Sequence, residues 1–313
     1  MTTAVGVYQV ACPAKVNLTL KVVGRREDGY HLLRMAMEPV SLADFLTLRL
    51  TPAAGREVSC RVRPPVAGLE EADNLVVRAA TAALRALDEI GPPPPGRLEF
   101  SLEKNVPAGA GLGGGSSDAA AALRLVNRVV GGGRLGEDKL AVLALALGAD
   151  VPFFLRPGLS RVEGIGERLF PCPHACRRWY VLVKPPVMIS TAAAYKKLNY
   201  KLTKNEFNIN MRQFFQRLPM GEKYSLFNDF EEVVFAEFPL LRELKEWLQD
   251  RDQAVGALMS GSGSTVYGLF TAYGPAREAY RAAVARWHPA GCQVFLAHNI
   301  GGRGGMGPGP GGQ

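Results

Sequence analysis

The sequence of 313 residues lacks any apolar run close to the roughly 18 to 20 residues that a membrane-spanning helix needs. Residues 1–10 also lack the basic start, apolar stretch and small-residue cleavage site of a secretion signal. These absences argue against a membrane or exported protein. We therefore expect a cytoplasmic protein.

Cysteine is scarce. The five cysteines are scattered and odd in number, which argues against a disulfide framework and favours a reducing compartment. The one local group, Cys172-Pro-His-Ala-Cys176, has no second paired element that would complete a zinc site. A surface loop is the favoured interpretation there.

A concentrated block of one charge is also missing. The formal net charge is +8, but Arg and Lys occur in separated pairs such as Arg25-Arg26 and Lys196-Lys197. Nucleic-acid and membrane surfaces are usually bound by a concentrated basic face, so neither is expected as a partner. The charge instead favours a polyanionic small-molecule substrate, and the sequence leaves the oligomeric state open.

Apolar residues make up 47% of the chain, enough for two medium hydrophobic cores. Alternation and helical spacing predict an α+β order of elements. Strands are expected at residues 7–10, 15–23, 45–50, 58–62, 98–102, 179–183, 254–259, 266–270 and 292–297. Helices are expected at residues 74–87, 117–130, 137–147, 191–198, within 210–249, and at 276–287.

A glycine-rich loop satisfies G-x-G-x-x-G at residues 109–114, a pattern that is weak when alone. A dinucleotide-binding turn would follow its strand directly, whereas residues 103–107 intervene here. A Walker A loop would end in Gly-Lys-Ser/Thr, but this loop ends Gly115-Ser116-Ser117. The protein-kinase motifs are absent as well. The remaining interpretation is a phosphate-binding loop. Its glycines let backbone N–H groups approach an anion closely, and two serine hydroxyls follow at the start of a helix. This arrangement predicts a triphosphate site.

Three segments in order carry a family resemblance. Pro107-Ala-Gly-Ala-Gly-Leu-Gly-Gly-Gly-Ser-Ser117 resembles the central motif of the GHMP kinases, which phosphorylate small alcohols. Pro13-Ala-Lys-Val-Asn-Leu18 and Met259-Ser-Gly-Ser-Gly-Ser-Thr265 resemble the two other motifs of the family. The resemblance implies an ATP-dependent kinase that uses Mg2+.

The family fold is expected to have two domains with the active site in the cleft between them. Residues 1–172 would form an N-terminal, ATP-binding α/β domain like ribosomal protein S5. Residues 173–298 would form a ferredoxin-like α+β domain, and the glycine-rich tail 299–313 would be disordered. Segment 199–227 matches no motif of the family.

Further segments resemble the family members whose acceptor alcohol is linked to cytidine diphosphate, in non-mevalonate isoprenoid precursor biosynthesis. The more diagnostic ones are Gly24-Arg-Arg-Glu-Asp-Gly-Tyr-His31 and Leu147-Gly-Ala-Asp-Val-Pro-Phe153. A homoserine or mevalonate type of kinase, or a nucleotide-binding regulator without catalysis, is the alternative.

Phosphoryl transfer to an alcohol needs a group that accepts the hydroxyl proton and a cation near the phosphate oxygens. Side chains alternate between the two faces of a strand, and in the strand at residues 15–23 every second residue is apolar. Lys15 and Asn17 therefore lie together on the opposite face, which looks out of the core. Asp150 lies between a helix end and an apolar stretch. Our hypothesis is that Asp150 deprotonates the hydroxyl, while Lys15 keeps it ionised and stabilises the developing charge. A solvated lysine and a helix-capping aspartate are the alternatives.

The resemblance implies the remaining site residues. An aromatic ring and a hydrogen-bonding side chain, Tyr30 and His31, suit a cytosine base, and Tyr195 would add a second aromatic. The other expected substrate residues are Asn17, Thr191, Gly261, Ser262 and Gly263. ATP is expected to contact Asn74 and the loop residues Pro107, Ala108, Gly109, Ala110, Gly111, Leu112, Gly113, Gly114, Gly115, Ser116 and Ser117. No carboxylate is an obvious Mg2+ ligand, and Asp118 is as well explained by the helix dipole.

Overall fold

The structure is a computed structural model that describes residues 6–66, 68–156, 158–172, 176–198 and 226–301. Three parts of the sequence interpretation lie wholly or partly outside these ranges. They are the middle of the Cys172 to Cys176 group, nearly all of segment 199–227, and the tail from residue 302.

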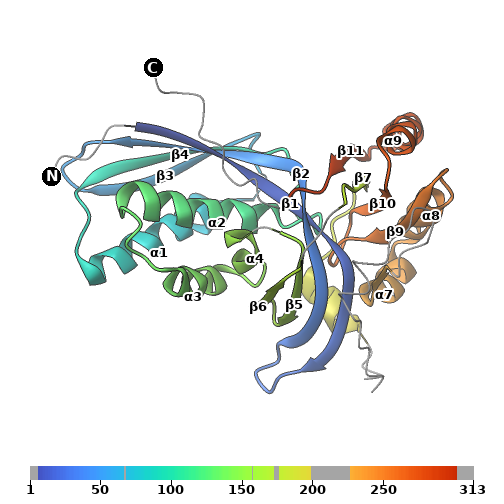
Figure 1. The fold of residues 1–313 in the computed structure, drawn as a ribbon, viewed down its shortest axis with the longest axis horizontal. Coiled ribbons are helices and arrows are strands. Elements are labelled where there is room, and N and C mark those ends of the chain that lie inside the picture. Colours follow the sequence, from blue (N-terminus) through green and yellow to red (C-terminus); the bar gives the residue numbers. More distant parts are fainter. Residues whose placement is uncertain (1–5, 67, 157, 173–175, 199–225, 302–313) are drawn as a thin grey trace.

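The first sheet is built around two long antiparallel strands, β1 (Gly6–Arg25) and β2 (His31–Thr51), which cross the middle of the molecule (Figure 1). Its strand order is β3-β4-β2-β1-β8, with β5 paired to β2 and β6 paired to β5. The shorter strands are β3 (Arg56–Arg63), β4 (Gly96–Glu103), β5 (Ser160–Gly164), β6 (Arg168–Pro171) and β8 (Phe227–Asn228).

The predicted pair of opening strands, residues 7–10 and 15–23, is wrong, because β1 is one continuous strand. A register shift between Pro13 and Ala14 lets the ladder pass the proline, which has no N–H to donate. The first half of β2 was not predicted at all. Residues 35–40 are buried without alternation, so the period-two signal of a half-exposed strand is missing there.

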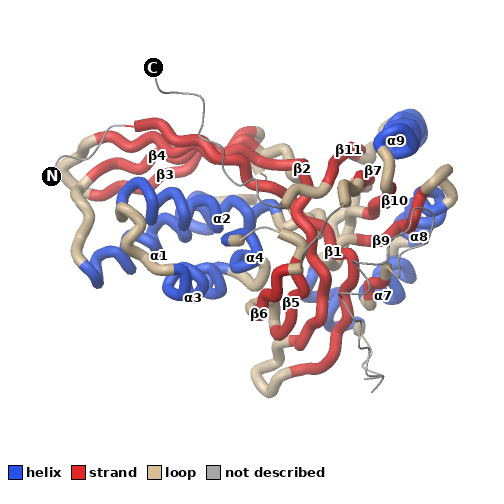
Figure 2. The backbone as a smooth tube through the Cα atoms, in the orientation of Figure 1, coloured by secondary structure: helices blue, strands red, loops and turns tan. Residues whose placement is uncertain are grey.

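Helices cover one face of this sheet, as Figures 1 and 2 show. They are η1 (Glu71–Asp73), α1 (Leu75–Ile90), α2 (Gly114–Leu125), α3 (Glu137–Leu147) and the short α4 (Val151–Leu155). Helix α2 starts three residues before the predicted 117 and continues as a π-helical turn, Val126–Val130. Ala119, Ala120 and Ala122 are buried, which lets α2 pack closely against its neighbours.

The second sheet has the order β11-β7-β10-β9 with every neighbouring pair antiparallel. Its strands are β7 (Trp179–Lys184), β9 (Ala254–Met259), β10 (Val266–Phe270) and β11 (Gln293–His298). Its helices are α5 (Thr191–Lys197), α7 (Phe230–Glu237), α8 (Pro239–Gln249) and α9 (Tyr273–Trp287). In chain order these strands are arranged 4-1-3-2, the ferredoxin-like topology that we expected. None of the helices in the described ranges is long and apolar enough to cross a membrane.

The two sheets are joined by buried polar contacts. Strand β8, from the second half of the chain, pairs with β1, and Asn299 bridges Val40 of β2. The Arg178 guanidinium lies 3.2 Å from the Glu38 carboxylate, and both side chains are almost fully buried. The sequence predicts that Asn299 starts the disordered tail, but in the structure this residue is buried. Its amide donates to Glu38 and to the Cys176 carbonyl, which holds it in place. The exact boundary between the two domains stays a prediction.

Candidate active site

The phosphate loop follows β4 and leads into α2. Three alternate residues, Gly109, Gly111 and Gly113, have φ angles of 61°, 75° and 70°, a region that favours glycine. Gly111 also faces the opposite wall of the cleft, where an added Cβ would lie 2.1 Å from the Ser260 carbonyl oxygen. The sequence therefore needs glycine here both for conformation and for close approach. The N-terminus of α2 follows directly and favours a bound anion.

Two cavities meet along this loop. One of about 440 Å³ lies between the loop and residues 62–75. The other, of about 940 Å³, lies between the loop, the β1–β2 hairpin and the second sheet. Both are lined by Gly109, Gly111, Gly113 and Ser116. A linear polyphosphate lying on the loop would thus reach from the smaller cavity into the larger one.

Most of the predicted site residues line one of the two cavities. The larger one brings together the predicted catalytic and substrate residues Lys15, Asn17, Tyr30, His31, Asp150, Thr191, Tyr195, Gly261, Ser262 and Gly263. The smaller one is lined by Asn74 and by loop residues 107–111 and 113–116. Two predicted loop residues, Leu112 and Ser117, line neither cavity, and both are buried.

Lys15 and Asp150 form the charged pair of the larger cavity. Lys15 Nζ lies 3.7 Å from Asp150 Oδ2 and donates a hydrogen bond to Asn17 Oδ1 at 2.6 Å. The Lys15 side chain is 4% exposed and that of Asp150 33%. Burial lowers the pKa of the Lys15 ammonium, and the Asp150 charge offsets only part of this effect. The alternation on this strand predicts that Lys15 and Asn17 lie together away from the core. In the structure both are buried and line the larger cavity.

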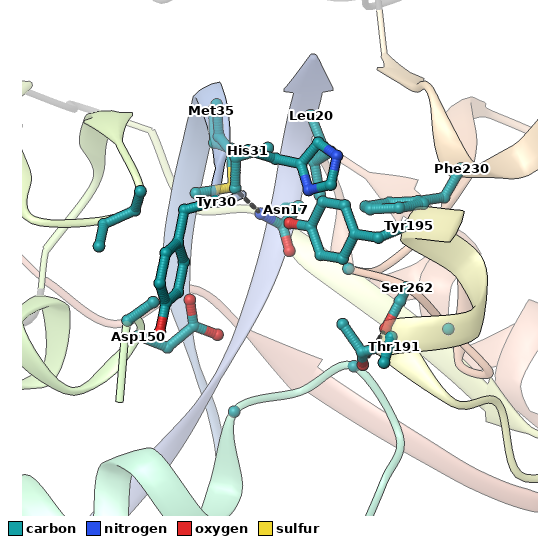
Figure 3. A pocket seen from close by; sticks show the side chains of 18 of the residues that line it. Asn17, Leu20, Tyr30, His31, Met35, Asp150, Thr191, Tyr195, Phe230 and Ser262 are labelled. Atoms are coloured by element: carbon teal, nitrogen blue, oxygen red, sulfur yellow. Dashed lines mark hydrogen bonds between the residues drawn. The ribbon is translucent and has the colours of Figure 1, made fainter. Parts of the chain in front are cut away.

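Asp150 occupies the N-cap position of α4, yet its side chain makes no capping hydrogen bond. Pro152 in the first turn of that helix has no N–H for a cap to accept. The carboxylate is directed instead toward the cavity that Lys15 also lines (Figure 3). The capping alternative for Asp150 therefore finds no support.

The aromatic wall of the larger cavity is formed by side chains from three elements. The His31 ring stacks on Tyr195 with centroids 4.5 Å apart, and Tyr195 contacts Phe230 edge to face at 4.8 Å. Tyr30 is 61% exposed and stands apart from the stacked pair (Figure 3). Burial together with the nearby Arg25 charge lowers the pKa of His31, which favours the neutral imidazole. A planar, neutral ligand would suit this wall.

Residues 259–265, here called the serine-glycine turn, connect β9 to β10 and close the cavity opposite the phosphate loop. The Ser262 and Thr191 hydroxyls are 2.7 Å apart and both face the cavity (Figure 3). Ser260 Oγ donates to the Gly111 carbonyl at 2.9 Å, and the Thr265 N–H donates to the Ala110 carbonyl at 3.2 Å. The turn is thereby fastened to the phosphate loop.

A buried charge cluster stands beside the smaller cavity. Lys104 Nζ pairs with Asp44 at 2.5 Å and with Asp118 at 2.8 Å. Burial raises the pKa of Asp118 to about 7, with the Asp44 charge adding to the effect and Lys104 opposing it. Asp118 lies in the second turn of α2, so this ion pair explains it better than the helix dipole. Asp44 also accepts the N–H groups of Asn105 and Val106, which fixes the entry to the loop.

Asn74 has a local role besides its place in the smaller cavity. Its Oδ1 accepts the Val76 N–H at 2.9 Å and caps α1. The sequence already carries this signal, since asparagine precedes the first helical residue.

Sequence reasoning missed Lys104, Ser260, Phe230 and Asn228. Ser260 lies inside a motif that we had recognised, but the other three carry no local pattern. They reach the site only because distant segments fold together.

Comparisons with known proteins agree with this geometry. Family models described as the N-terminal and C-terminal domains of GHMP kinases match residues 74–158 and 207–289. A 4-diphosphocytidyl-2-C-methyl-D-erythritol kinase of Citrifermentans bemidjiense is 42% identical, covering 87% of this chain and 92% of that protein. One of Solibacter usitatus is 43% identical, covering 82% and 79%.

Among solved structures, a 4-(cytidine 5'-diphospho)-2C-methyl-D-erythritol kinase matches with a TM-score of 0.78 at 34% identity. The match covers 94% of this chain and all of that one. A homoserine kinase from Cytophaga hutchinsonii matches with a TM-score of 0.68 at 18% identity, covering 94% of each chain. That second likeness concerns the fold alone.

Proposed function

Because the chain belongs to the GHMP kinase family, we propose that it phosphorylates the 2-hydroxyl of 4-diphosphocytidyl-2-C-methyl-D-erythritol with ATP. The products are the 2-phosphate and ADP, in the non-mevalonate route to isoprenoid precursors. The observation that carries the proposal is the position of Lys15 and Asp150. They lie in the larger cavity, where it meets the smaller one along the phosphate loop.

The smaller cavity would hold the nucleoside of ATP, and the loop amides would hold its phosphates. Asp150 would accept the proton of the acceptor hydroxyl as the oxygen attacks the γ-phosphorus and the bond to the ADP oxygen breaks. The Lys15 ammonium would offset the charge that spreads over the transferred phosphoryl group. Asn17, which accepts a hydrogen bond from Lys15, would fix the direction of that side chain.

The aromatic wall would select the acceptor. His31 and Tyr195 offer a stacking surface for the cytosine ring, and Tyr30 stands at the mouth of the cavity. Thr191, Ser262 and the glycines of the serine-glycine turn would donate to the diphosphate of the acceptor. A free hydroxy acid such as mevalonate has no ring that could stack on this aromatic wall.

We propose that magnesium binds together with ATP. The described part of the chain holds no cluster of three acidic, histidine or cysteine side chains that could bind a metal alone, and Mg2+ commonly relies on substrate phosphates. When bound, it would neutralise phosphate charge. We also propose that the enzyme works in the reducing cytoplasm, which suits its five free cysteines.

The proposal is tested by an ADP-release assay that offers the cytidyl-methylerythritol substrate beside homoserine and mevalonate. We expect ADP release only with the first. Turnover of homoserine or mevalonate alone would replace the proposed substrate, and ATP binding without turnover of any of the three would favour the noncatalytic regulator.

A further inference from the structure

Asn228 is a buried asparagine in β8 whose amide bonds to the serine-glycine turn. Its Nδ2 donates to the Met259 carbonyl at 2.8 Å and to the Gly261 carbonyl at 2.7 Å. Its Oδ1 accepts the Phe230 N–H at 3.0 Å, and the residue is 6% exposed. Both amide protons are therefore used to hold carbonyls on either side of Ser260.

The held segment lies close to the proposed reacting groups. Gly261 has a φ of 58°, and a Cβ built there would lie 3.3 Å from Lys15 Nζ and 3.3 Å from Gly111 Cα. Between the two held carbonyls, Ser260 Oγ donates to the Gly111 carbonyl. A shift of the turn by 1 Å would thus change the surroundings of Lys15 and of the phosphate loop together.

Strand β8 itself is well anchored on β1. Residues Phe227 and Asn228 pair with Thr19 and Leu20, and Asp229 Oδ2 accepts the Val22 N–H at 2.8 Å. The Asn228 amide therefore transmits the position of β1, which carries Lys15, to the turn on the other side of the cavity. Among ordinary side chains only Asn and Gln offer two neutral donors from one nitrogen, which suits two carbonyl acceptors.

We propose that Asn228 is a positioning residue for phosphoryl transfer, which fixes the serine-glycine turn against Lys15 and the phosphate loop. The inference rests on the proposed kinase function. Because reacting groups must be aligned closely, a misplacement of about 1 Å lowers turnover by about 100-fold.

The test compares Asn228→Asp with a matched control, Asn127→Asp. The new carboxylate would have nearly the shape of the amide but would face two carbonyl oxygens without a proton to donate. Asn127 is also buried, with its amide on the Leu135 carbonyl at 3.0 Å, but it lines neither cavity. We expect kcat to fall about 10- to 100-fold in Asn228→Asp, with the KM for ATP changed less than about threefold. The control should keep kcat within about threefold of the wild type.

A second measurement needs no acceptor. Hydrogen exchange of a peptide covering residues 259–265 reports the turn, whose Ser260, Gly263 and Thr265 amides are hydrogen-bonded. We expect at least about tenfold faster exchange of this peptide in Asn228→Asp and in the milder Asn228→Ala, but not in Asn127→Asp. If Asn228→Asp does not fold, Asn228→Ala provides both readouts.

The outcomes separate the two proposals. A wild-type chain that is inactive on the cytidyl substrate would contradict the function, while the exchange rates would still report the Asn228 contact. If residues 259–265 exchange hydrogen at the wild-type rate in both Asn228 variants, the positioning role is overturned. A kcat loss no larger than that of the control would also overturn it.

Discussion

At the scale of single residues, the proposed reaction depends on a lysine that folding places in an unfavourable environment. Lys15 is buried beside a partly exposed carboxylate, so its charge is less stable than that of a surface lysine. Such a residue contributes little to the stability of the fold. Its burial is better explained by catalysis, because a buried ammonium interacts strongly with phosphate oxygens.

Asp150→Asn should remove the proposed base while preserving the shape of the side chain. We expect kcat to fall about 1000-fold, since general-base catalysis contributes roughly 100- to 10,000-fold. ATP affinity measured by calorimetry should stay within about threefold, because Asp150 does not line the smaller cavity. Near-normal turnover would rule out Asp150 as the base.

His31→Ala should separate the acceptor from ATP. The change removes the ring that stacks on Tyr195 in the larger cavity, and a lost stacking or hydrogen-bonding partner costs about 1 to 3 kcal/mol. We expect the acceptor KM to rise about 10- to 100-fold while the KM for ATP stays nearly constant. Equal increases in both KM values would argue against base recognition by His31.

Asp118 should make stability depend on pH. Its folded-state pKa of about 7 lies above its usual value of 3.8, so the folded protein binds more protons than the unfolded chain between these values. The free energy of unfolding should therefore decrease as pH rises from 5 toward 7. In Asp118→Asn this decrease should be smaller by roughly 1 to 3 kcal/mol, measured by urea unfolding at pH 5, 6, 7 and 8. Parallel pH profiles for the two proteins would contradict this.

At the scale of elements, the phosphate loop and the serine-glycine turn work as one interlocked unit. The loop comes from the first half of the chain and the turn from the hairpin β9–β10. Hydrogen bonds from Ser260 and Thr265 join them, and the contact at Gly111 is too close for a side chain. The position of each element is therefore tied to that of the other.

Gly111→Ala should break this unit. The new Cβ would collide with the Ser260 carbonyl oxygen, so the loop and turn must separate. Gly132→Ala is the control, because Gly132 has a similar φ of 60° but no atom within 4 Å of the added Cβ. We expect about 1 to 2 kcal/mol of destabilisation in the control and at least about 3 kcal/mol in Gly111→Ala. Gly111→Ala should also lose at least about 100-fold in kcat, and equal effects of the two changes would refute the interlock.

At the scale of the whole molecule, the two sheets are held together by a buried polar cluster around Glu38. Glu38 of β2 accepts hydrogen bonds from Arg178, which precedes β7, from Tyr180 in β7 and from Asn299 after β11. A buried ion pair adds little net stability, but removing one partner leaves an uncompensated charge. The cluster therefore constrains how the sheets meet.

Arg178→Met should lower the free energy of unfolding by about 3 to 5 kcal/mol, because Glu38 would remain buried without its cation. Arg286→Met is the control: it breaks an exposed pair with Glu243 and should cost less than about 1 kcal/mol. Chemical denaturation gives both values. If Glu38→Leu is added to Arg178→Met, part of the stability should return, and no recovery would mean that charge burial is not the cause.

Most helices and strands, the phosphate loop and the pairing of Lys15 with Asp150 could be predicted from the sequence. The helices, strands and loop depend on local patterns: alternation, helical spacing, a capping residue or a motif. The pairing of Lys15 with Asp150 is instead predicted from the family resemblance and from the needs of phosphoryl transfer. The continuous β1 and the first half of β2 could not be predicted. Pro13 suggests a break between two strands, although β1 is continuous. Residues 35–40 are buried on both faces of the sheet, so their sequence lacks the apolar–polar alternation of a half-exposed strand.

The sequence by itself thus determined which chemical groups are available, and from them it predicts the chemistry that we propose: glycines for an anion, a lysine and an aspartate for transfer, and aromatic side chains for a base. Tertiary structure alone decided which side chains hold these groups in place. Asn228, Ser260 and Lys104 act across long sequence separations, and such contacts leave no periodic signal in the chain. They arise because two sheets close on one cleft, where most buried polar groups find a partner.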